Sequence, residues 1–211
     1  MRIALFGGSF NPIHLGHLRA AEEDREAIGL DVVYFVPAAS PPHKLPLGLA
    51  AAEQRLQMVR LATKGNRHFM VSDVEIRRSG NSFTIDTVRY FRATMRTHLE
   101  LYLIVGGDQF AELDTWKEAD ELTASCNIIV HTRLSEKQPD AEAPVAILHR
   151  FGYIERDNHY VHYSGNTLNF VATTFFPISA TLIRRKLAAG ESIRYLVPAD
   201  VADYIERYSP Y

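Results

Sequence analysis

The chain has 211 residues, 46% of them hydrophobic, and its 23 basic and 25 acidic side chains leave a formal net charge of −2. This size and composition suit one folded domain over residues 1–211 and argue against disorder. The nearly balanced charge gives no support for a general binder of nucleic acids or membrane surfaces. The one cysteine, Cys126, excludes an intrachain disulfide and a zinc site built from cysteines, and we expect its thiol to pack near a strand.

The sequence predicts no targeting or membrane segment. The N-terminus opens directly into an apolar strand at residues 2–6, without a charged and then apolar leader. No apolar run approaches the roughly 20 residues that a membrane-spanning helix requires. We therefore expect a cytoplasmic protein.

A turn rich in glycine follows that strand and leads into a helix. The turn is Gly7-Gly8-Ser9-Phe10-Asn11-Pro12, and apolar residues at helical spacing begin at Leu15. Unpaired N–H groups at a helix start, next to glycines that admit a ligand close to the backbone, favour phosphate binding. We expect His14 and His17 on one face of the helix, where each ring can donate to a phosphate oxygen. Two histidines that merely cap a surface helix are the alternative interpretation.

The middle of the chain alternates predicted strands and helices. Strands are predicted at residues 31–36, 68–76, 99–105 and 127–131, and helices at residues 50–62 and from Thr84, which is placed to cap its helix. The loop 37–44 is stiffened by prolines and carries Lys44, either a solvated lysine or a phosphate contact.

Three further candidate residues follow, of which Asp108 and Arg133 lie just past predicted strand ends. Asp108, after Gly106-Gly107, can accept hydrogen bonds from ribose hydroxyls, cap a helix, or do both. Trp116, at the start of a further helix, is by residue type a core side chain, but it can also stack on a flat ring. Arg133 can bind a phosphate or carboxylate, or be solvated.

In the last third of the chain, the sequence pattern is weak at residues 136–163 and clear again from residue 167. Residues 136–144 are predicted as a loop, and 145–148 and 160–163 as strands that pair around a turn at 155–158, with no function assigned. A strand at 167–176 leads to a helix capped by Ser179 and stopped by Gly190, and a closing helix is predicted at 199–208. Arg184 lies near the positive end of its helix dipole, where a cation is disfavoured unless an anion binds.

Two motifs carry a resemblance to a known family. Gly7-Gly8-Ser9-Phe10-Asn11-Pro12 followed by His14-Leu15-Gly16-His17 resembles the signature of the HxGH nucleotidyltransferase superfamily, and most of all the bacterial nicotinate-nucleotide adenylyltransferases. The segment 178–184 is similar to their Ile-Ser-x-Thr-x-Ile-Arg motif, which grips ATP phosphates. The chain departs from the family at Asn11, where Asp is common, and after Arg133, where Pro-Gly is usual.

The alternation of strands and helices predicts an α/β fold with a doubly wound, mostly parallel sheet of six strands. The resemblance implies the Rossmann-like nucleotidyltransferase version of this fold, with a short C-terminal helical tail. It also implies adenylyl transfer from ATP to nicotinate mononucleotide in NAD biosynthesis, with Mg²⁺ bound mainly through ATP phosphates and no protein metal site. The implied catalytic residues are His14, His17 and Arg184. The implied nucleotide contacts are Gly7, Gly8, Ser9, Phe10, Lys44, Gly106, Asp108, Ile178, Ser179 and Thr181, and the implied mononucleotide contacts are Ser82, Thr84, Trp116 and Arg133.

Other functions on the same fold stay open. An adenylyltransferase for nicotinamide mononucleotide or phosphopantetheine would share the histidine motif, and Trp116 and the segment 82–84 disfavour the second of these. A non-catalytic nucleotide sensor is disfavoured by the intact His14, His17 and Arg184. The sequence is compatible with a homo-oligomer and does not decide between nicotinate and nicotinamide.

Overall fold

The computed structural model describes residues 1–41, 48–78, 80–95, 99–133, 142–157 and 159–211, and for residues 133 and 142–144 it describes the backbone alone. Within these residues, eight strands form one sheet in the order β3-β2-β1-β4-β5-β8-β7-β6. The strands are β1 (Arg2–Gly8), β2 (Val32–Pro37), β3 (Phe69–Val71), β4 (Glu100–Gly106), β5 (Asn127–Arg133), β6 (Tyr153–Arg156), β7 (His159–His162) and β8 (Thr167–Thr173).

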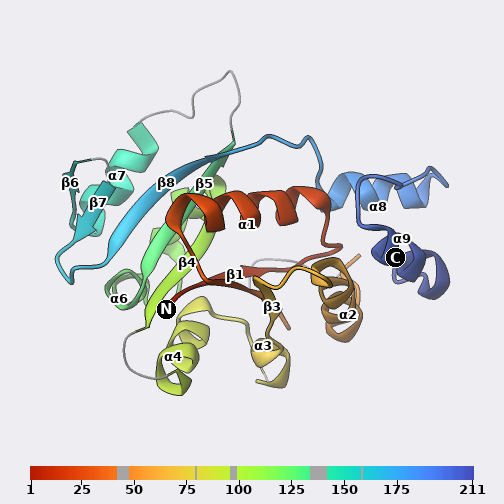
Figure 1. Ribbon diagram of the computed structural model, residues 1–211, viewed down its shortest axis with the longest axis horizontal. Helices are drawn as coiled ribbons and strands as arrows, with labels where there is room; N and C mark the ends of the chain where they lie inside the picture. Colours follow the sequence, from red (N-terminus) through yellow and green to blue (C-terminus); the bar gives the residue numbers. More distant parts are fainter. Residues whose placement is uncertain (42–47, 79, 96–98, 134–141, 158) are drawn as a thin grey trace.

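The helices connect and flank these strands (Figure 1). They are α1 (Leu15–Ile28), α2 (Ala52–Thr63), α3 (Val74–Arg77), α4 (Thr84–Thr94), α5 (Gly107–Ala111), the 3-10 turn η1 (Leu113–Thr115), α6 (Ala119–Ser125), α7 (Glu142–Arg150), α8 (Ala180–Ala188) and α9 (Ala199–Tyr208). In the described part of the chain, no helix is both long and apolar enough to cross a membrane.

The sheet reverses its strand order between β1 and β4. Ala4 in β1 pairs with Val33 of β2 on one side and with Tyr102 of β4 on the other, and both pairings are parallel. The chain moves outward from β1 to β3 and then returns across β1 to build the second half. Only β6 and β7, at one edge, are antiparallel to their neighbours. The predicted doubly wound, mostly parallel sheet is confirmed, and its switch point is where such folds bind ligands.

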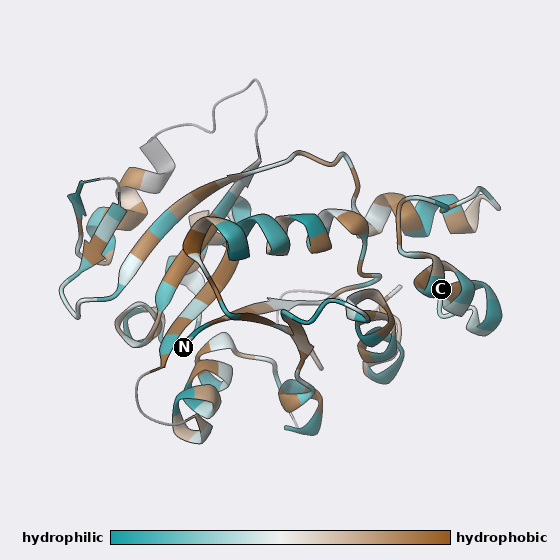
Figure 2. Ribbon diagram, in the orientation of Figure 1, coloured by the Kyte–Doolittle hydropathy of each residue, from teal (hydrophilic) through white to brown (hydrophobic). Residues whose placement is uncertain are grey.

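Helices cover both faces of the sheet. Phe35, Met58 and Ile183 belong to a buried cluster between the sheet and α1, α2, α8 and α9, whereas Val88 and Leu122 belong to a cluster on the opposite face. Figure 1 shows α1 on one side of β1 and α3 and α4 on the other, and Figure 2 shows hydrophobic colours on the central strands. Each such fully buried side chain contributes about 1.5–3 kcal/mol to folding, so the core fixes the two sheet edges that meet at the switch point.

The predicted strand at 68–76 is wrong beyond Val71. The backbone N–H of Ser72 still donates to Phe35, but the Ser72 hydroxyl accepts from the N–H of Val74, where α3 begins. Val74 then packs in the core. A short apolar run fits a strand and a helical turn equally well, so the sequence pattern alone did not separate them.

The prediction for 145–148 is also wrong. These residues lie in α7, which starts at Glu142, so the end of the predicted loop 136–144 is helical as well; residues 136–141 lie outside the described residues. The strand that pairs with β7 is β6, with Ile154 opposite Val161. β7 confirms the strand predicted at 160–163, and β6 and β7 extend the predicted sheet of six strands to eight. β8 ends at Thr173 rather than at Phe176.

Candidate active site

A cleft of about 1180 Å³ opens at the carboxyl ends of β1 and β4. Its volume slightly exceeds the roughly 300–1,000 Å³ of a pocket for one small ligand. The structure brings together, along its wall, Gly7, Gly8, Ser9, Phe10, His14, His17, Ser82, Thr84, Gly106, Asp108, Trp116, Ile178, Ser179, Thr181 and Arg184. Lys44 and the side chain of Arg133 lie outside what the structure describes.

The two histidines form a stacked pair at the start of α1. Their ring centroids lie 3.6 Å apart, with the planes inclined by 27°. His14 is the N-cap in an extended conformation rather than a helical residue, which corrects the expectation of one shared helix face. The Nδ1 atom of His17 accepts from the backbone N–H of His14 at 3.2 Å, so a neutral His17 ring carries its hydrogen on Nε2. His17 is thereby held as a hydrogen-bond donor on the wall of the cleft.

Two glycines make room for aromatic rings rather than only for a ligand. A Cβ atom on Gly16 would lie 3.1 Å from Nδ1 of His14, and one on Gly8 would lie 3.1 Å from Cζ of Phe10. A Cβ on Gly7, in contrast, would meet nothing within 4 Å among the described residues. Gly7 therefore keeps an open approach to the backbone, and Gly16 sets the position of His14.

We expect Gly16→Ala to lower kcat/KM by about 10-fold or more, because the new methyl group would displace the ring of His14, which the sequence predicts to be catalytic, and a displaced catalytic group loses effective concentration. Alanine is the better helix former by about 1 kcal/mol, so the melting temperature should be unchanged or raised. Steady-state kinetics together with thermal unfolding checks both parts. Ala27→Gly, on the exposed side of the same helix, is the control: it should destabilise the protein without the kinetic loss.

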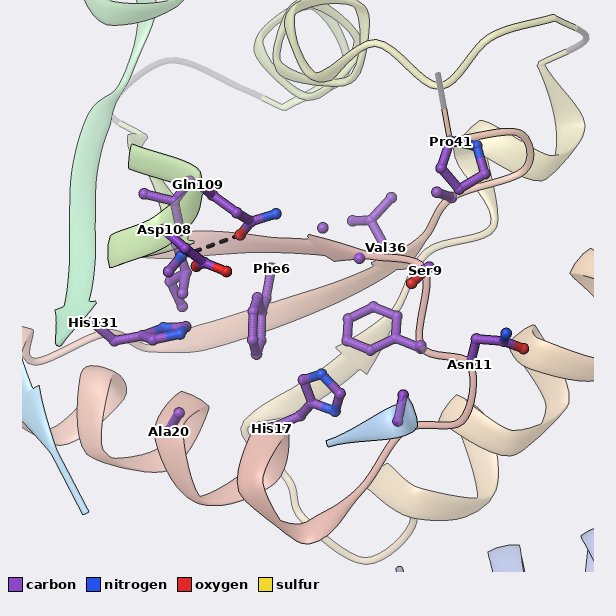
Figure 3. Close-up of a pocket in the computed structure, with 18 of the residues that line it drawn as sticks. Phe6, Ser9, Asn11, His17, Ala20, Val36, Pro41, Asp108, Gln109 and His131 are labelled. Carbon is purple, nitrogen blue, oxygen red and sulfur yellow. Dashed lines mark hydrogen bonds between the residues drawn. The ribbon is translucent and has the colours of Figure 1, made fainter. Parts of the chain in front are cut away.

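An aromatic row forms the floor of the cleft (Figure 3). Phe6 lies between Phe10, at a centroid distance of 5.7 Å, and His131, at 5.8 Å, and Phe10 also contacts His17 at 5.3 Å. Phe10 is buried, and its φ of 43° is in the left-handed region. The ring of Phe10 thus packs edge-on against that of His17.

The helix after β8 reaches back to the glycine turn. Nη1 of Arg184 donates to the backbone carbonyl of Asn11 at 2.7 Å, and Nη2 donates to the Thr181 hydroxyl at 3.4 Å. The hydroxyl of Ser179 accepts from the N–H of Leu182 at 3.1 Å, which confirms the predicted N-cap. Arg184 therefore has a carbonyl partner of its own at the positive end of α8, and a bound anion is not its sole source of compensation.

Asn11 uses both ends of its amide. Its Nδ2 donates to the carbonyl of Gly48 at 2.7 Å, and its Oδ1 accepts from the N–H of Ala50 at 3.0 Å. An ionised aspartate accepts only, so it cannot make the first of these bonds. Asn11, which departs from the family pattern, thus joins the segment before α2 to the glycine turn.

Arg55 holds three backbone segments together beneath the same turn. It is fully buried, and its guanidinium donates to the carbonyls of Ala50 at 2.9 Å, Ser9 at 2.7 Å and Ala39 at 3.1 Å. These carbonyls belong to the segment before α2, the glycine turn and the loop after β2. Arg55 was not among the residues selected from the sequence, although its position next to the core residue Leu56 indicated that Arg55 is buried.

The end of β4 supplies a second polar wall. Asp108 lies in the first turn of α5, and Gly106 is the N-cap, so the expectation that Asp108 caps this helix is wrong. The N–H of Gly106 donates to Oε1 of Gln109 at 3.2 Å (Figure 3). The Asp108 carboxylate is exposed and turned toward the cleft, where it can accept hydrogen bonds.

The third wall comes from the start of α4. Phe83, not Thr84, is the N-cap, so the predicted cap is displaced by one residue. The Ser82 hydroxyl accepts from the N–H groups of Ala39 at 2.9 Å and Ser40 at 3.3 Å, so it fastens two loops to each other. Ser82 lines the cleft, and the main role of its hydroxyl is to hold these two loops together.

Glu75 and Trp116 complete this wall. Glu75 is buried and accepts from the Thr87 hydroxyl at 2.6 Å. Burial raises the pKa of Glu75, although hydrogen bonds from Thr87 and Ser82 oppose the shift. Trp116 follows η1 instead of starting a helix, and its ring is partly buried against the core while it faces the cleft.

The sequence analysis also missed a buried pair, Asp24 and His131. Oδ2 of Asp24 lies 3.4 Å from Nδ1 of His131. Burial raises the pKa of Asp24, and the neighbouring His131 opposes the shift. The available signal was a carboxylate four residues after Ala20, on the inner face of α1. Among the described residues, no group of three or more His, Cys, Asp or Glu side chains could hold a metal ion.

Comparisons with known proteins agree with this geometry. The model of the cytidylyltransferase-like family matches residues 5–186. A "Probable nicotinate-nucleotide adenylyltransferase" of Pelobacter propionicus is 44% identical over 213 residues, which cover 100% of this chain and 98% of the relative. One with the same name from Geobacter metallireducens is 45% identical, covering 97% and 95%. The fold is similar to that of Plasmodium falciparum nicotinic acid mononucleotide adenylyltransferase complexed with NaAD, with a TM-score of 0.73, 18% identity, and coverage of 99% and 96%.

Proposed function

This chain belongs to the nicotinate-nucleotide adenylyltransferases of the cytidylyltransferase-like family, and from that premise we propose that it transfers the adenylyl group of ATP to nicotinate mononucleotide. The products are deamido-NAD and pyrophosphate. The observation that carries the proposal is that the stacked histidines and Arg184, which contacts the carbonyl of Asn11 173 residues earlier in the chain, line one cleft. The volume of the cleft leaves room for two nucleotides side by side.

The chemistry requires placement more than proton transfer. The phosphate of the mononucleotide is ionised near neutral pH and attacks the α-phosphorus of ATP in line, while the bond to the pyrophosphate oxygen breaks. Negative charge then develops on the α-phosphate oxygens and on the leaving pyrophosphate. His14, His17 and Arg184 are the groups that stabilise this charge, because donors aimed at developing charge lower the barrier most.

The glycine turn and the start of α8 hold the phosphates. Gly7 and Ser9 face the cleft from one side, and Ser179 and Thr181 face it from the other. Mg²⁺, which neutralises triphosphate charge, would be held mainly by ATP oxygens and water.

The acceptor binds against Trp116 and the start of α4. Trp116 offers a flat ring for stacking on the pyridine, and Thr84 offers a hydroxyl at the start of α4. Positive charge nearby comes from Lys117, whose Nζ lies 4.7 Å from the centre of the Phe83 ring and 3.3 Å from Asp86. Lys117 also lies 3.6 Å from Glu118, so an acceptor carboxylate would compete with Asp86 and Glu118 for this cation, and an amide would not.

Pyrophosphate release with ATP and each acceptor tests the proposed function. We expect turnover with nicotinate mononucleotide to exceed that with nicotinamide mononucleotide by at least about 10-fold, the effect of roughly 1.4 kcal/mol of differential binding. Phosphopantetheine should give none. A preference for nicotinamide mononucleotide would replace the proposed acceptor, and no release with any acceptor would favour a nucleotide sensor.

We expect Trp116→Ala to raise KM for nicotinate mononucleotide by about 5- to 10-fold, because an aromatic pair contributes roughly 0.5–1.5 kcal/mol beyond the area that it buries. KM for ATP should change less than about 2-fold. Trp116→Phe, which keeps a ring, is the matched control and should restore most of the affinity. If alanine raised both KM values equally, Trp116 would be a general support of the cleft and not a stacking group.

A further inference from the structure

The buried Asp24–His131 pair stands at the end of the cleft and has no part in the mechanism above. We propose that His131, oriented by Asp24, donates a hydrogen bond to a ribose hydroxyl of ATP, and that Asp108 accepts one from the same hydroxyl. His131 is then a substrate contact, and Asp24 is a positioning residue. The inference rests on the proposed function only in naming ATP as the nucleotide.

The pair fixes the orientation of the His131 ring. Asp24, on the inner face of α1, is fully buried at 0% exposure, whereas the side chain of His131 keeps 18% of its surface accessible. Nδ1 of His131 and both carboxylate oxygens of Asp24 are buried and have no hydrogen-bond partner among the described residues. The 3.4 Å contact is therefore the one polar interaction that either group has on its buried side.

The other edge of the ring faces the end of β4. A Cβ atom on Gly106 would lie 3.5 Å from Nε2 of His131 and 2.6 Å from Oδ1 of Asp108. The two polar atoms thus flank one small space, which stays empty of protein because residue 106 has no side chain. Figure 3 shows both residues beside Phe6, whose ring meets that of His131 edge-on.

The environment of Asp24 decides which nitrogen of His131 carries hydrogen. An ionised carboxylate in this position is fully desolvated, and the nearby Glu23 adds negative charge. Burial raises the pKa of Asp24 and so favours its protonated form, whose hydroxyl can donate to Nδ1 of His131. A neutral ring that accepts at Nδ1 carries its hydrogen on Nε2, the atom on the side of Gly106.

A donor and an acceptor on one small space select for a hydroxyl group. A hydroxyl accepts from Nε2–H and donates to the Asp108 carboxylate at the same time. The exocyclic amine of adenine does not match, because its nitrogen donates and is a poor acceptor. Among the groups of ATP, the 2′- and 3′-hydroxyls of the ribose fit this chemistry.

The test measures dissociation constants for ATP, 2′-deoxy-ATP, 3′-deoxy-ATP and ITP without any acceptor, for the whole protein and its variants. We expect His131→Ala to weaken ATP binding by about 5- to 10-fold, the effect of one hydrogen bond. The penalty should fall below about 2-fold for the deoxynucleotide that lacks the contacted hydroxyl, and it should persist in full for ITP. Asp24→Asn should show the same pattern with a smaller penalty, because the ring is less firmly oriented.

Two further variants keep the result interpretable. Asp24→Ala combined with His131→Phe replaces the buried pair by apolar groups of similar total volume, which is often neutral for folding, and should reproduce the loss of ribose discrimination. His159→Ala, in β7, should leave all four constants unchanged. The inference is overturned by an equal penalty for both deoxynucleotides, by a penalty that disappears with ITP, or by an unchanged constant for ATP. Loss of pyrophosphate release with intact ribose discrimination would refute the proposed reaction alone.

Discussion

Replacing His17 by alanine is expected to lower kcat by about 100- to 1,000-fold, the usual effect of removing one donor that stabilises a transition state. The dissociation constant for ATP should change less than about 3-fold, because the donor is needed for charge that develops only during the reaction. His17 is suited to this role since its Nδ1 atom accepts from the backbone of His14 and its ring rests on Phe10. Single-turnover rates and ATP titration separate the two effects.

The control for this experiment is His149→Ala. His149 is exposed on α7 and does not line the cleft, so its removal should leave kcat unchanged. Equal losses in kcat and in ATP affinity for His17→Ala would contradict the assigned role, since they would indicate uniform binding of ground state and transition state.

Replacing Arg55 by methionine is expected to lower the free energy of unfolding by about 3 kcal/mol or more. The change leaves one buried and two partly buried carbonyls without their donor, and each unsatisfied buried group costs roughly 1–3 kcal/mol, with partial relief by relaxation and water. For a chain of this length that corresponds to a fall in melting temperature of about 6–12 °C. Because one of the carbonyls belongs to Ser9, KM for ATP should rise as well.

Arg60→Met is the matched control on the same helix. Arg60 is exposed, and its one described ion pair, to Asp73 at 3.9 Å, is long. Exposed pairs of this kind contribute roughly 0–1 kcal/mol. Urea unfolding of both variants gives the comparison, and a loss below about 1 kcal/mol for Arg55→Met would show that the three carbonyls find other partners.

The central sheet could be predicted from the sequence because the pattern of apolar residues is clear in its strands. The apolar runs of β1, β2, β4 and β5 are each bounded by glycine, proline or polar residues, and parallel strands buried on both faces read in this way. The errors fall on short apolar runs such as 145–148, which fit either period and are decided by what they pack against. Tertiary packing determined α3 and α7.

The residues of the candidate site also fall into two groups, those that could be predicted from the sequence and those that could not. Residues within a contiguous motif, such as His14 and Arg184, were predicted because local chemistry and spacing point to phosphate binding. Arg55, Asp24 and His131 act through partners far away in sequence, and no local pattern names those partners. The sequence did contain a charged residue on the inner face of α1, Asp24, and another inside α2, Arg55. A charged residue in such a position indicates a buried polar contact but does not indicate its function.

The contact between Arg184 and the carbonyl of Asn11 bears on when the protein acquires its activity during synthesis. The histidine motif leaves the ribosome first, whereas β8, which lies inside the sheet, and α8 follow more than 150 residues later. Such distant pairings form slowly, because the intervening chain must first be ordered. A nascent chain that lacks its last quarter therefore contains the glycine turn but not Arg184, which contacts that turn in the complete fold.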